Sequence, residues 1–384
     1  MKKVNNPKIR LKKYNDVWEN VKLIEAAPIV MGQSPDSKNY TDNPNDFILV
    51  QGNADMHNGR VVPRVWTTQI TKLAEKGDLI LSVRAPVGDI GKTDYNVVLG
   101  RGVAAVKGNE FIFQLLSRMK QSNYWSKLST GSTFESINSN DIKSAEIYLP
   151  SMEEQQAIGS LFRTLDDLLT SYKDNLANYH SLKATMLAKM FPKAGQTVPE
   201  IRLDGFEGEW EAKILSRVTN ITMGQSPKSE NYTDNPNDYI LVQGNADIKN
   251  KQVVPRLWTT EVTKMAEIGD IILTVRAPVG DIGKTDYNVV IGRGVAAIKG
   301  NDFIFYTLEK MKMTGFWNRF STGSTFDSIS SNDIKEAIIQ IPTLKEQQAI
   351  GAYFSNLDNL ISAHQEKIFQ LETLKKKLLQ DMFI

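Results

Sequence analysis

Side chains suited to nucleic acid recur among the predicted turns of this sequence. Arg and Lys contact phosphates and guanine, while Gln, Ser and Thr contact base edges and backbone. In the first half of the chain these candidates are Gln33, Ser34, Arg64, Arg84, Lys92, Arg101 and Thr133. Their counterparts, each 192 residues later, are Gln225, Ser226, Arg256, Arg276, Lys284, Arg293 and Thr325. The residue types therefore predict two nucleic-acid surfaces, one in each half.

Residues that could catalyse a reaction are scarce. The sequence has no cysteine and three histidines, His57, His180 and His364. The lack of cysteine excludes disulfides, Cys-ligated zinc, iron–sulfur clusters and thiol nucleophiles. None of the histidines has a histidine 192 residues away, so a base shared by both halves is missing. We expect neither a catalytic centre nor a metal site in this chain.

Four short motifs resemble enzyme signatures but are incomplete. Asn43–Phe47 lacks the second proline of an amino-methyltransferase loop, so an Asn-Pro turn is favoured. Gly100–Ala105 fits a dinucleotide pattern, but a turn follows it instead of a helix. Gly91–Thr93 lacks the upstream glycine of a phosphate-binding loop. Asp141–Lys143 lacks the Pro-Asp partner of a nuclease, and we expect Asp141 to cap a helix start.

The elements that must position these residues come as a domain-sized repeat. Met31–Pro35 recurs as Met223–Pro227, and Glu154–Gly159 recurs as Glu346–Gly351. About four in five residues match over 31–110, somewhat over half over 111–150 and roughly one in three over 151–192. Solenoid repeats are far shorter than this, so the pattern indicates two similar domains with internal pseudo-two-fold symmetry.

Each module begins as a mixed α/β domain. The runs 47–50, 79–83 and 96–99 are short, apolar and partly β-branched, which is typical of buried strands. Residues 111–120 have a helical pattern, and 147–150 are extended ahead of a proline. The sequence therefore predicts two α/β (α+β) target domains.

After Pro150 the hydrophobic period changes to the spacing of a coiled coil. Apolar residues step by four and three from Ile158 to Met190, and again from Ile350 to Met382, each with one lysine in the stripe. A long helix with one apolar stripe needs a partner, and its symmetric partner here is the other helix. We expect an antiparallel pair of helices with a globular module at each end, in a dumbbell arrangement.

The order of these elements and several strings resemble the specificity (S) subunit of type I restriction–modification systems. The resemblance is carried by Met31–Pro35, Gly131–Phe134, Asp141–Lys143, Glu154–Gly159 and Lys183–Pro192. The first four strings recur in full 192 residues on. Of the last string, Lys183, Leu187, Met190 and Phe191 recur, and Ile384 stands where the first copy has Pro192. The resemblance covers essentially the full chain.

This resemblance implies a non-catalytic subunit whose two target-recognition domains read a bipartite DNA sequence. It implies double-stranded DNA, two methyltransferase (M) subunits and restriction (R) subunits as partners. S-adenosylmethionine, ATP and Mg are expected on those partner subunits and no cofactor on this chain. Methyltransferase docking is one interpretation of the helix starts, and helix capping is the other. The residues concerned are Glu154, Gln155, Gln156, Glu346, Gln347 and Gln348.

Domain boundaries follow from the repeat. We predict recognition domain 1 over 1–150 with its core at 31–150, a spacer helix over 151–190 and a connector over 191–210. Recognition domain 2 then covers 211–342, and the second spacer helix covers 343–384.

Composition limits how the chain could bind DNA and in which compartment we expect it. The net charge is +2 with 23% charged residues, so we expect DNA contact to be local and to be supplemented by partner subunits. Apolar runs are too short for a membrane span, and the N-terminus lacks a signal-peptide core, so we expect a cytoplasmic protein.

Two further hypotheses follow from comparing the halves. Because the recognition domains are so alike, we expect inverted copies of one half-site, giving an interrupted palindrome. Positions that differ, such as His57 and Lys249 or Gly59 and Lys251, should not read bases. The alternative function is a stand-alone coiled-coil DNA-binding regulator, which would bind its site tightly without partners.

Overall fold

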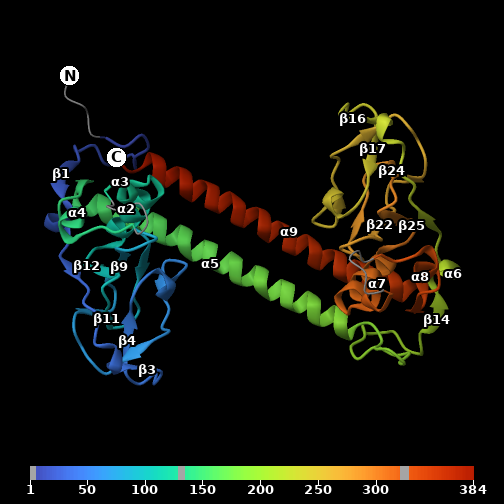
Figure 1. Ribbon diagram of the computed structural model, residues 1–384, viewed down its shortest axis with the longest axis horizontal. Helices are drawn as coiled ribbons and strands as arrows, with labels where there is room; N and C mark the ends of the chain where they lie inside the picture. Colours follow the sequence, from blue (N-terminus) through green and yellow to red (C-terminus); the bar gives the residue numbers. More distant parts are fainter. Residues whose placement is uncertain (1–5, 129–134, 321–327) are drawn as a thin grey trace. The chain divides into compact units, whose positions relative to one another are not determined.

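The computed structural model describes residues 6–128, 135–320 and 328–384. The chain divides into two compact units, Met1–Lys173 with Glu366–Ile384, and Asp174–Gln365. Each unit is discontinuous in sequence because the boundary falls within both long helices, α5 (Met152–Lys189) and α9 (Leu344–Asp381). A unit therefore combines one globular part with a portion of each long helix (Figure 1).

The globular part of the first unit is built from three sheets among its described residues. A two-stranded sheet pairs β1 (Glu19–Lys22) with β13 (Glu146–Leu149). The six-stranded sheet has the order β2 (Ile29–Met31), β12 (Val103–Val106), β9 (Leu79–Ser82), β10 (Ile90–Lys92), β6 (Arg60–Val61) and β5 (Met56–His57). The five-stranded sheet has the order β3 (Tyr40–Thr41), β7 (Trp66–Thr67), β4 (Phe47–Val50), β11 (Val97–Leu99) and β8 (Leu73–Ala74).

The central strands form where the sequence is apolar without alternation. All four residues of β9 and of β12 are buried, as are the three of β11. Strands buried on both faces cannot alternate with polar residues, which explains their continuous Val, Leu, Ile and Ala runs. The predicted strands at 47–50, 79–83 and 96–99 are therefore confirmed within one or two residues.

Helices cover the sheets at the end next to the long helices. They are α1 (Leu23–Ala26), α2 (Glu110–Gln121), α3 (Tyr124–Leu128) and α4 (Ser139–Lys143), with short 3₁₀ turns η1 (Ser37–Asn39) and η2 (Asn53–Asp55). Asn109 caps α2 by accepting the amide of Ile112. At α4 the Asp141 carboxylate accepts the Asn138 amide at 2.8 Å, which confirms the predicted capping role.

The second unit repeats this architecture element by element. A two-stranded sheet pairs β14 (Glu211–Ile214) with β26 (Ile338–Ile341). The six-stranded sheet has the order β15 (Ile221–Met223), β25 (Val295–Ile298), β22 (Ile271–Thr274), β23 (Ile282–Lys284), β19 (Gln252–Val253) and β18 (Ile248–Lys249). The five-stranded sheet has the order β16 (Tyr232–Thr233), β20 (Trp258–Thr259), β17 (Tyr239–Val242), β24 (Val289–Ile291) and β21 (Met265–Ala266). The helices of this unit are α6 (Leu215–Val218), α7 (Asp302–Met313) and α8 (Ser331–Lys335), with η3 (Ser229–Asn231), η4 (Asn245–Asp247) and η5 (Phe316–Phe320).

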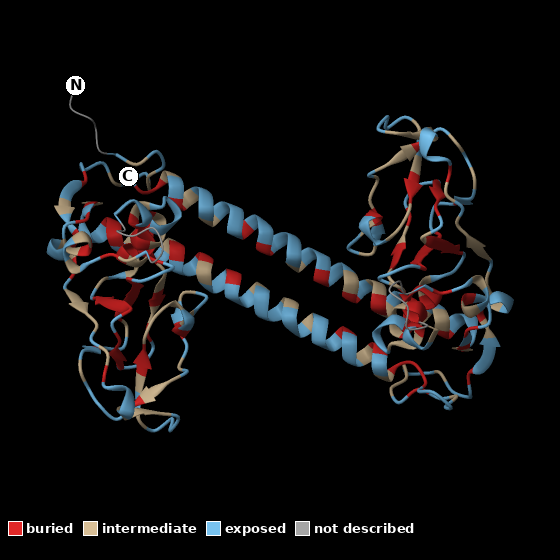
Figure 2. Cartoon of the chain, viewed as in Figure 1, coloured by how far each residue is buried: buried red, intermediate tan, exposed pale blue. Residues whose placement is uncertain are grey.

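The long helices run antiparallel within each unit. In the first unit Lys375 of α9 pairs with Asp166 of α5 at 2.5 Å, and in the second Lys183 of α5 pairs with Asp358 of α9 at 2.6 Å. Every position of both predicted stripes is buried or intermediate, and Figure 2 shows buried positions recurring along the two helices. The predicted fold class, two mixed α/β domains with antiparallel coiled-coil helices, is confirmed.

Both helix ends lead back into a globular core. In the second unit Phe191, just after α5, stacks on Phe303 with ring centroids 5.5 Å apart and lies 6.1 Å from Trp210. In the first unit Phe383, just after α9, lies 5.1 Å from Phe111. Each globular core thus contains the end of the helix that began in the other unit.

Candidate nucleic-acid interface

One end of the first unit's sheets gathers several of the predicted DNA-binding residues. The chain leaves β2 toward Gln33, whose amide donates to the Leu99 carbonyl at 2.9 Å. Ser34 Oγ accepts the Arg101 amide at 3.0 Å. Beyond β9, the Val83 amide donates to the Gly102 carbonyl at 2.9 Å, which brings Arg84 to the same edge. Segments separated by tens of residues therefore meet here.

Gln51 and Tyr40 complete this edge, although neither was among the residues predicted from the sequence. The Gln51 side-chain amide donates to the Tyr40 hydroxyl at 2.8 Å, and its backbone amide donates to Asp55 Oδ2 at 2.7 Å. Exact recurrence of the string Gln51–Asp55 at 243–247 was the signal that could have identified it. We call the set Gln33, Ser34, Gln51, Arg84 and Arg101 the loop end.

Glycines allow the loops of this edge to pack closely. A Cβ at Gly102 would collide with the Gln51 carbonyl oxygen, and one at Gly32 with the Gly100 carbonyl oxygen. Only a residue without a side chain permits such backbone contact. The loop end is consequently a tightly packed surface in which the side chains of Gln33 and Arg101 face solvent.

The three arginines of this region differ in the contacts that their guanidinium groups make. Arg84 and Arg101 are exposed, and among the described residues neither guanidinium has an ion-pair partner. Arg64 instead donates to the Ala54 carbonyl at 2.8 Å and lies 3.8 Å from the Asp55 carboxylate. Arg64 thus supports the η2 turn behind Gln51, while the other two are available to a ligand.

Lys92 is separated from the loop end. It pairs with Leu79 at the opposite end of β9 and lies 3.5 Å from the Glu110 carboxylate at the start of α2. Lys284 likewise forms an ion pair with Asp302. Two other predicted contacts, Thr133 and Thr325, lie outside the described residues.

The loop end of the second unit has the same geometry. Ser226 Oγ accepts the Arg293 amide at 3.0 Å, and the Gln243 side chain donates to the Tyr232 hydroxyl at 2.6 Å. Arg256 donates to the Ala246 carbonyl at 2.8 Å, as Arg64 does in the first unit. Gln225 and Arg276 are exposed like their counterparts. Two equivalent surfaces therefore exist, one in each unit.

The helix-start residues predicted to bind a methyltransferase are mostly internal. Glu154 is 1% exposed and accepts a two-point ion pair from Arg10, at 2.8 and 2.7 Å. Gln155 donates to the Pro150 carbonyl at 3.0 Å and accepts from Asn109 at 2.8 Å.

Glu346 and Gln347 repeat these contacts with Arg202 and Asn301. The side chains of Gln156 and Gln348 are the exposed members of the two groups. Glu154 and Glu346 therefore hold the segments that contain Arg10 and Arg202 against the starts of α5 and α9. The prediction that the helix starts bind a methyltransferase subunit then rests mainly on Gln156 and Gln348.

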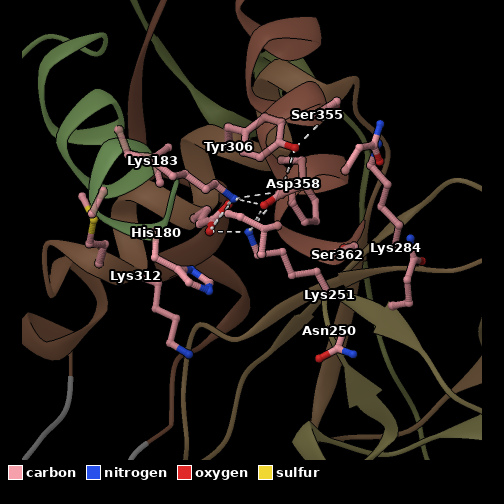
Figure 3. Close-up of a pocket in the computed structure, with 18 of the residues that line it drawn as sticks. His180, Lys183, Asn250, Lys251, Lys284, Tyr306, Lys312, Ser355, Asp358 and Ser362 are labelled. Carbon is pink, nitrogen blue, oxygen red and sulfur yellow. Dashed lines mark hydrogen bonds and ion pairs between the residues drawn. The ribbon is translucent and has the colours of Figure 1, made fainter. Parts of the chain in front are cut away.

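The second unit also contains a cavity of about 820 Å³ between α7, the β18–β19 turn and both long helices. Figure 3 shows Lys183, Lys251, Tyr306 and Asp358 converging on it. Lys183, at the polar position of the α5 stripe, is 5% exposed and contacts both Glu309 and Asp358.

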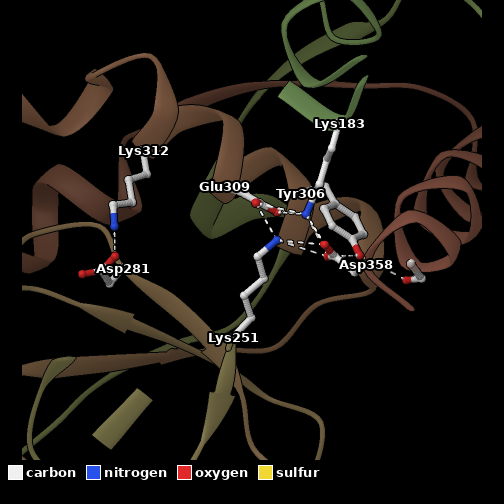
Figure 4. A network of polar contacts seen from close by, with 8 residues as sticks. Lys183, Lys251, Asp281, Tyr306, Glu309, Lys312 and Asp358 are labelled. Carbon is white, nitrogen blue, oxygen red and sulfur yellow. Dashed lines mark hydrogen bonds and ion pairs between the residues drawn. The ribbon is translucent and has the colours of Figure 1, made fainter. Parts of the chain in front are cut away.

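These side chains form one polar network, drawn in Figure 4. Lys183 Nζ lies 3.0 Å from Glu309 and 2.6 Å from Asp358, while Lys251 Nζ lies 2.6 Å from Glu309 and 3.1 Å from Asp358. The Tyr306 hydroxyl donates to Asp358 Oδ2 at 2.9 Å. Two ammonium groups face two carboxylates, so the charges balance without a ligand.

For the network's lysines and for Asp358, burial and ion pairing shift the pKa in opposite directions. Burial lowers the pKa of Lys183. Burial alone would raise the pKa of Asp358, but the two lysines and the Tyr306 hydroxyl lower it overall. Burial opposes the charged form of Lys251 too, yet Glu309 and Asp358 raise its pKa. Asp358 therefore ionises more readily in this network than a free aspartate does.

Metal-binding clusters and membrane-spanning helices are both missing from the described residues. No group of three or more His, Cys, Asp or Glu side chains there could hold a metal ion. In that same part of the chain, no helix is long and apolar enough to cross a membrane.

Comparison with known proteins identifies the repeated unit. The model of the type I restriction modification DNA specificity domain matches residues 15–201 and again 207–373. A putative type I restriction enzyme MjaX specificity subunit of Methanocaldococcus jannaschii is 30% identical over 281 residues, covering 70% of this chain and 66% of that protein. The MjaVIII specificity subunit of the same organism is 21% identical over 270 residues, covering 65% and 64%. The chain thus spans slightly less than two thirds of the length of these relatives.

Solved structures share the fold. A type I restriction–modification S subunit from M. genitalium superimposes with a TM-score of 0.67 at 16% identity, covering 99% of both chains. A chain from a structural study of type I R-M complex assembly and conformational transition gives a TM-score of 0.57 at 24% identity, covering 94% of this chain and 96% of that one. With the family model matched once in each half, this chain belongs to the type I restriction modification DNA specificity family and carries two copies of its domain.

Proposed function

We propose that this chain is the DNA-recognition subunit of a type I restriction–modification complex. Each globular domain would read one half of a bipartite duplex site through its loop end. The observation that carries the proposal is the duplicated loop end, where exposed Arg84 and Arg101 lie beside Gln33 and Gln51. Arginine and glutamine at one edge suit phosphate contact and base-edge hydrogen bonding.

The chain would contribute recognition, and its partners would contribute chemistry. We infer two methyltransferase subunits and restriction subunits as partners, with S-adenosylmethionine, ATP and Mg bound by them. The exposed Gln156 and Gln348 are the proposed contacts for the methyltransferase subunits. A net charge of +2 over the whole chain also favours help from partners in holding a polyanion. Because the substrate is cellular DNA, we expect the complex to work in the cytoplasm.

A stand-alone regulator is the less favoured function. Family membership over both halves supports a specificity subunit, and no feature of the described residues distinguishes a regulator. Purification with and without the neighbouring gene products separates the two. A specificity subunit requires its methyltransferase partner for solubility or tight binding, whereas a regulator binds its site alone.

The loop-end arginines provide the test. Arg84→Ala with Arg276→Ala should weaken specific binding by on the order of 1–3 kcal/mol for each arginine–base hydrogen-bonding pair that the substitutions remove. Affinity of the reconstituted complex is measured by fluorescence anisotropy on the duplex identified by modified-base mapping. Lys76→Ala is the matched control, since Lys76 is exposed and the second half has Ile268 there. Equal affinity of the double variant and the control would refute a role for these arginines.

A further inference from the structure

The β18–β19 turn of the second unit contains a residue that its conformation disfavours. Asn250 and Lys251 have φ of 48° and 63°, and the equivalent Asn58 and Gly59 of the first unit have φ of 49° and 73°. A two-residue hairpin turn with positive φ at both positions favours Asn-Gly. Lysine has a Cβ, so this conformation costs it energy that glycine avoids. The second unit thus accepts local strain that the first unit does not have.

The strained residue makes contacts that a glycine could not. Lys251 Nζ lies 2.6 Å from Glu309 on α7 and 3.1 Å from Asp358 on α9 (Figure 4). Lys183 on α5 binds the same two carboxylates. One hairpin is thereby joined to α7 and, through shared carboxylates, to both long helices. Strain that persists in a folded protein is commonly compensated by its surroundings and associated with function.

The first unit lacks the residues for this connection. Gly59 stands in place of Lys251 and Ser117 in place of Glu309. Its hairpin cation is Arg60, which pairs at 2.9 Å with Asp94 of the same globular domain, and both side chains are about half exposed. Among the described residues, no ion pair joins the β5–β6 hairpin to α2 or to a long helix. The two domains therefore differ in attachment although their sheets agree.

We propose that Lys251 is a positioning residue that fixes the second recognition domain on the coiled-coil helices. The first domain, which has an untethered hairpin, is held less firmly. The consequence for recognition rests on the proposed function. A domain fixed to the helices reads its half-site at one distance along the duplex, so Lys251 would sharpen discrimination between sites of different spacer length.

We call the ion pairs of Lys251 with Glu309 and Asp358 the tether, and hydrogen exchange tests it without DNA. Lys251→Gly restores the Asn-Gly turn that folds in the first unit, so the variant should fold. Exchange of the backbone amides in 248–253 should accelerate about tenfold, because opening of the hairpin no longer breaks the network. Lys251→Arg should retain most of the protection, since a guanidinium can bind both carboxylates. Exchange in Lys251→Gly at the wild-type rate would overturn the tether.

The first unit offers the reciprocal experiment. Gly59→Lys alone introduces the strained lysine without a counterpart of Glu309, so exchange at 56–61 should not slow and should accelerate somewhat. Gly59→Lys with Ser117→Glu supplies the acid next to Asp166 and should slow that exchange. If the single and double variants exchange equally, carboxylate pairing is not what protects the hairpin, and the proposal fails.

DNA binding tests the positioning role. The reconstituted complex is titrated with its recognised duplex and with duplexes whose spacer is one base pair shorter or longer. Lys251→Gly should bind the natural spacer nearly as well as wild type but discriminate at least about threefold less against the altered spacers. A decrease in stability alone would weaken binding to all three duplexes by the same factor.

The outcomes separate the two proposals. If the wild-type complex binds no duplex specifically, the proposed function fails while the exchange data still decide the tether. Faster exchange with unchanged spacer discrimination would refute the positioning role.

Discussion

Single residues at the loop end show how backbone packing shapes a binding surface. Gln33, Gln51 and Arg101 come from three separate loops, which can approach because Gly32 and Gly102 have no side chain. The polar groups that hold these loops together are largely backbone amides and carbonyls. A surface built in this way depends on the glycines as much as on the side chains that would touch DNA.

Gly102→Ala should therefore damage the loop end. The new Cβ would collide with the Gln51 carbonyl oxygen, and relief of that overlap should cost about 1–3 kcal/mol of folding stability. The melting temperature of the first unit's transition measures this destabilisation. Gly52→Ala is the control, because a Cβ there has nothing within 4 Å and its φ of 177° is ordinary extended backbone. Equal melting temperatures for the two variants would contradict close packing at Gly102.

At the scale of elements, the lysine in each helical stripe explains the orientation of the helix pair. Lys375 meets Asp166 in the first unit, and Lys183 meets Asp358 in the second. A buried or partly buried cation in a hydrophobic seam is tolerated when a carboxylate lies opposite, and it disfavours other registers. The polar interruption visible in the sequence thus marks the point where each helix pairs with its antiparallel neighbour.

A charge swap in the first unit tests this pairing. Lys375→Asp would place two carboxylates together and should cost about 1–3 kcal/mol, and Asp166→Lys in the same chain should restore most of it. Denaturant unfolding of the single and double variants gives the coupling free energy. Lys377→Asp, an equal charge change at an exposed position of α9, should have little effect. Failure of the second substitution to rescue the first would exclude an antiparallel register at these residues.

At the scale of the whole molecule, the chain is one module used twice. Sheet orders, loop-end contacts and seam lysines agree between the halves. The differences between the two recognition domains include the Lys251 network and charged residues near the 3₁₀ turns. Similar recognition surfaces should read similar bases, and helices that run in opposite directions favour half-sites in opposite orientation.

The recognised sequence is accordingly predicted to be an interrupted palindrome. Modified-base mapping of the host genome would report both half-sites at once. Inverted copies of one short sequence are the expected result. Unrelated half-sites would show that the few differing residues, and not the shared loop end, decide which bases are read.

Much of the fold was predictable because its signals are local. Hydrophobic periodicity located the central strands, α2 and both long helices, and the capping role of Asp141 followed from its position at the start of a short helix, in the first turn. For the candidate site, the sequence predicted which residues could contact DNA but not where they lie relative to one another in space. Gln51 and Tyr40 were overlooked because neither is unusual in its own segment.

The sequence by itself determined the repeat, the change from strand to helix period after Pro150 and the family resemblance, since each is written in residues close together or at a fixed interval. Only the tertiary structure decided which candidates share a surface. Strand direction and register bring Arg84 beside Arg101 and carry Lys92 to the other end of β9. They likewise place Lys251 against Glu309 and Asp358, because long-range packing, not local pattern, sets what a side chain meets.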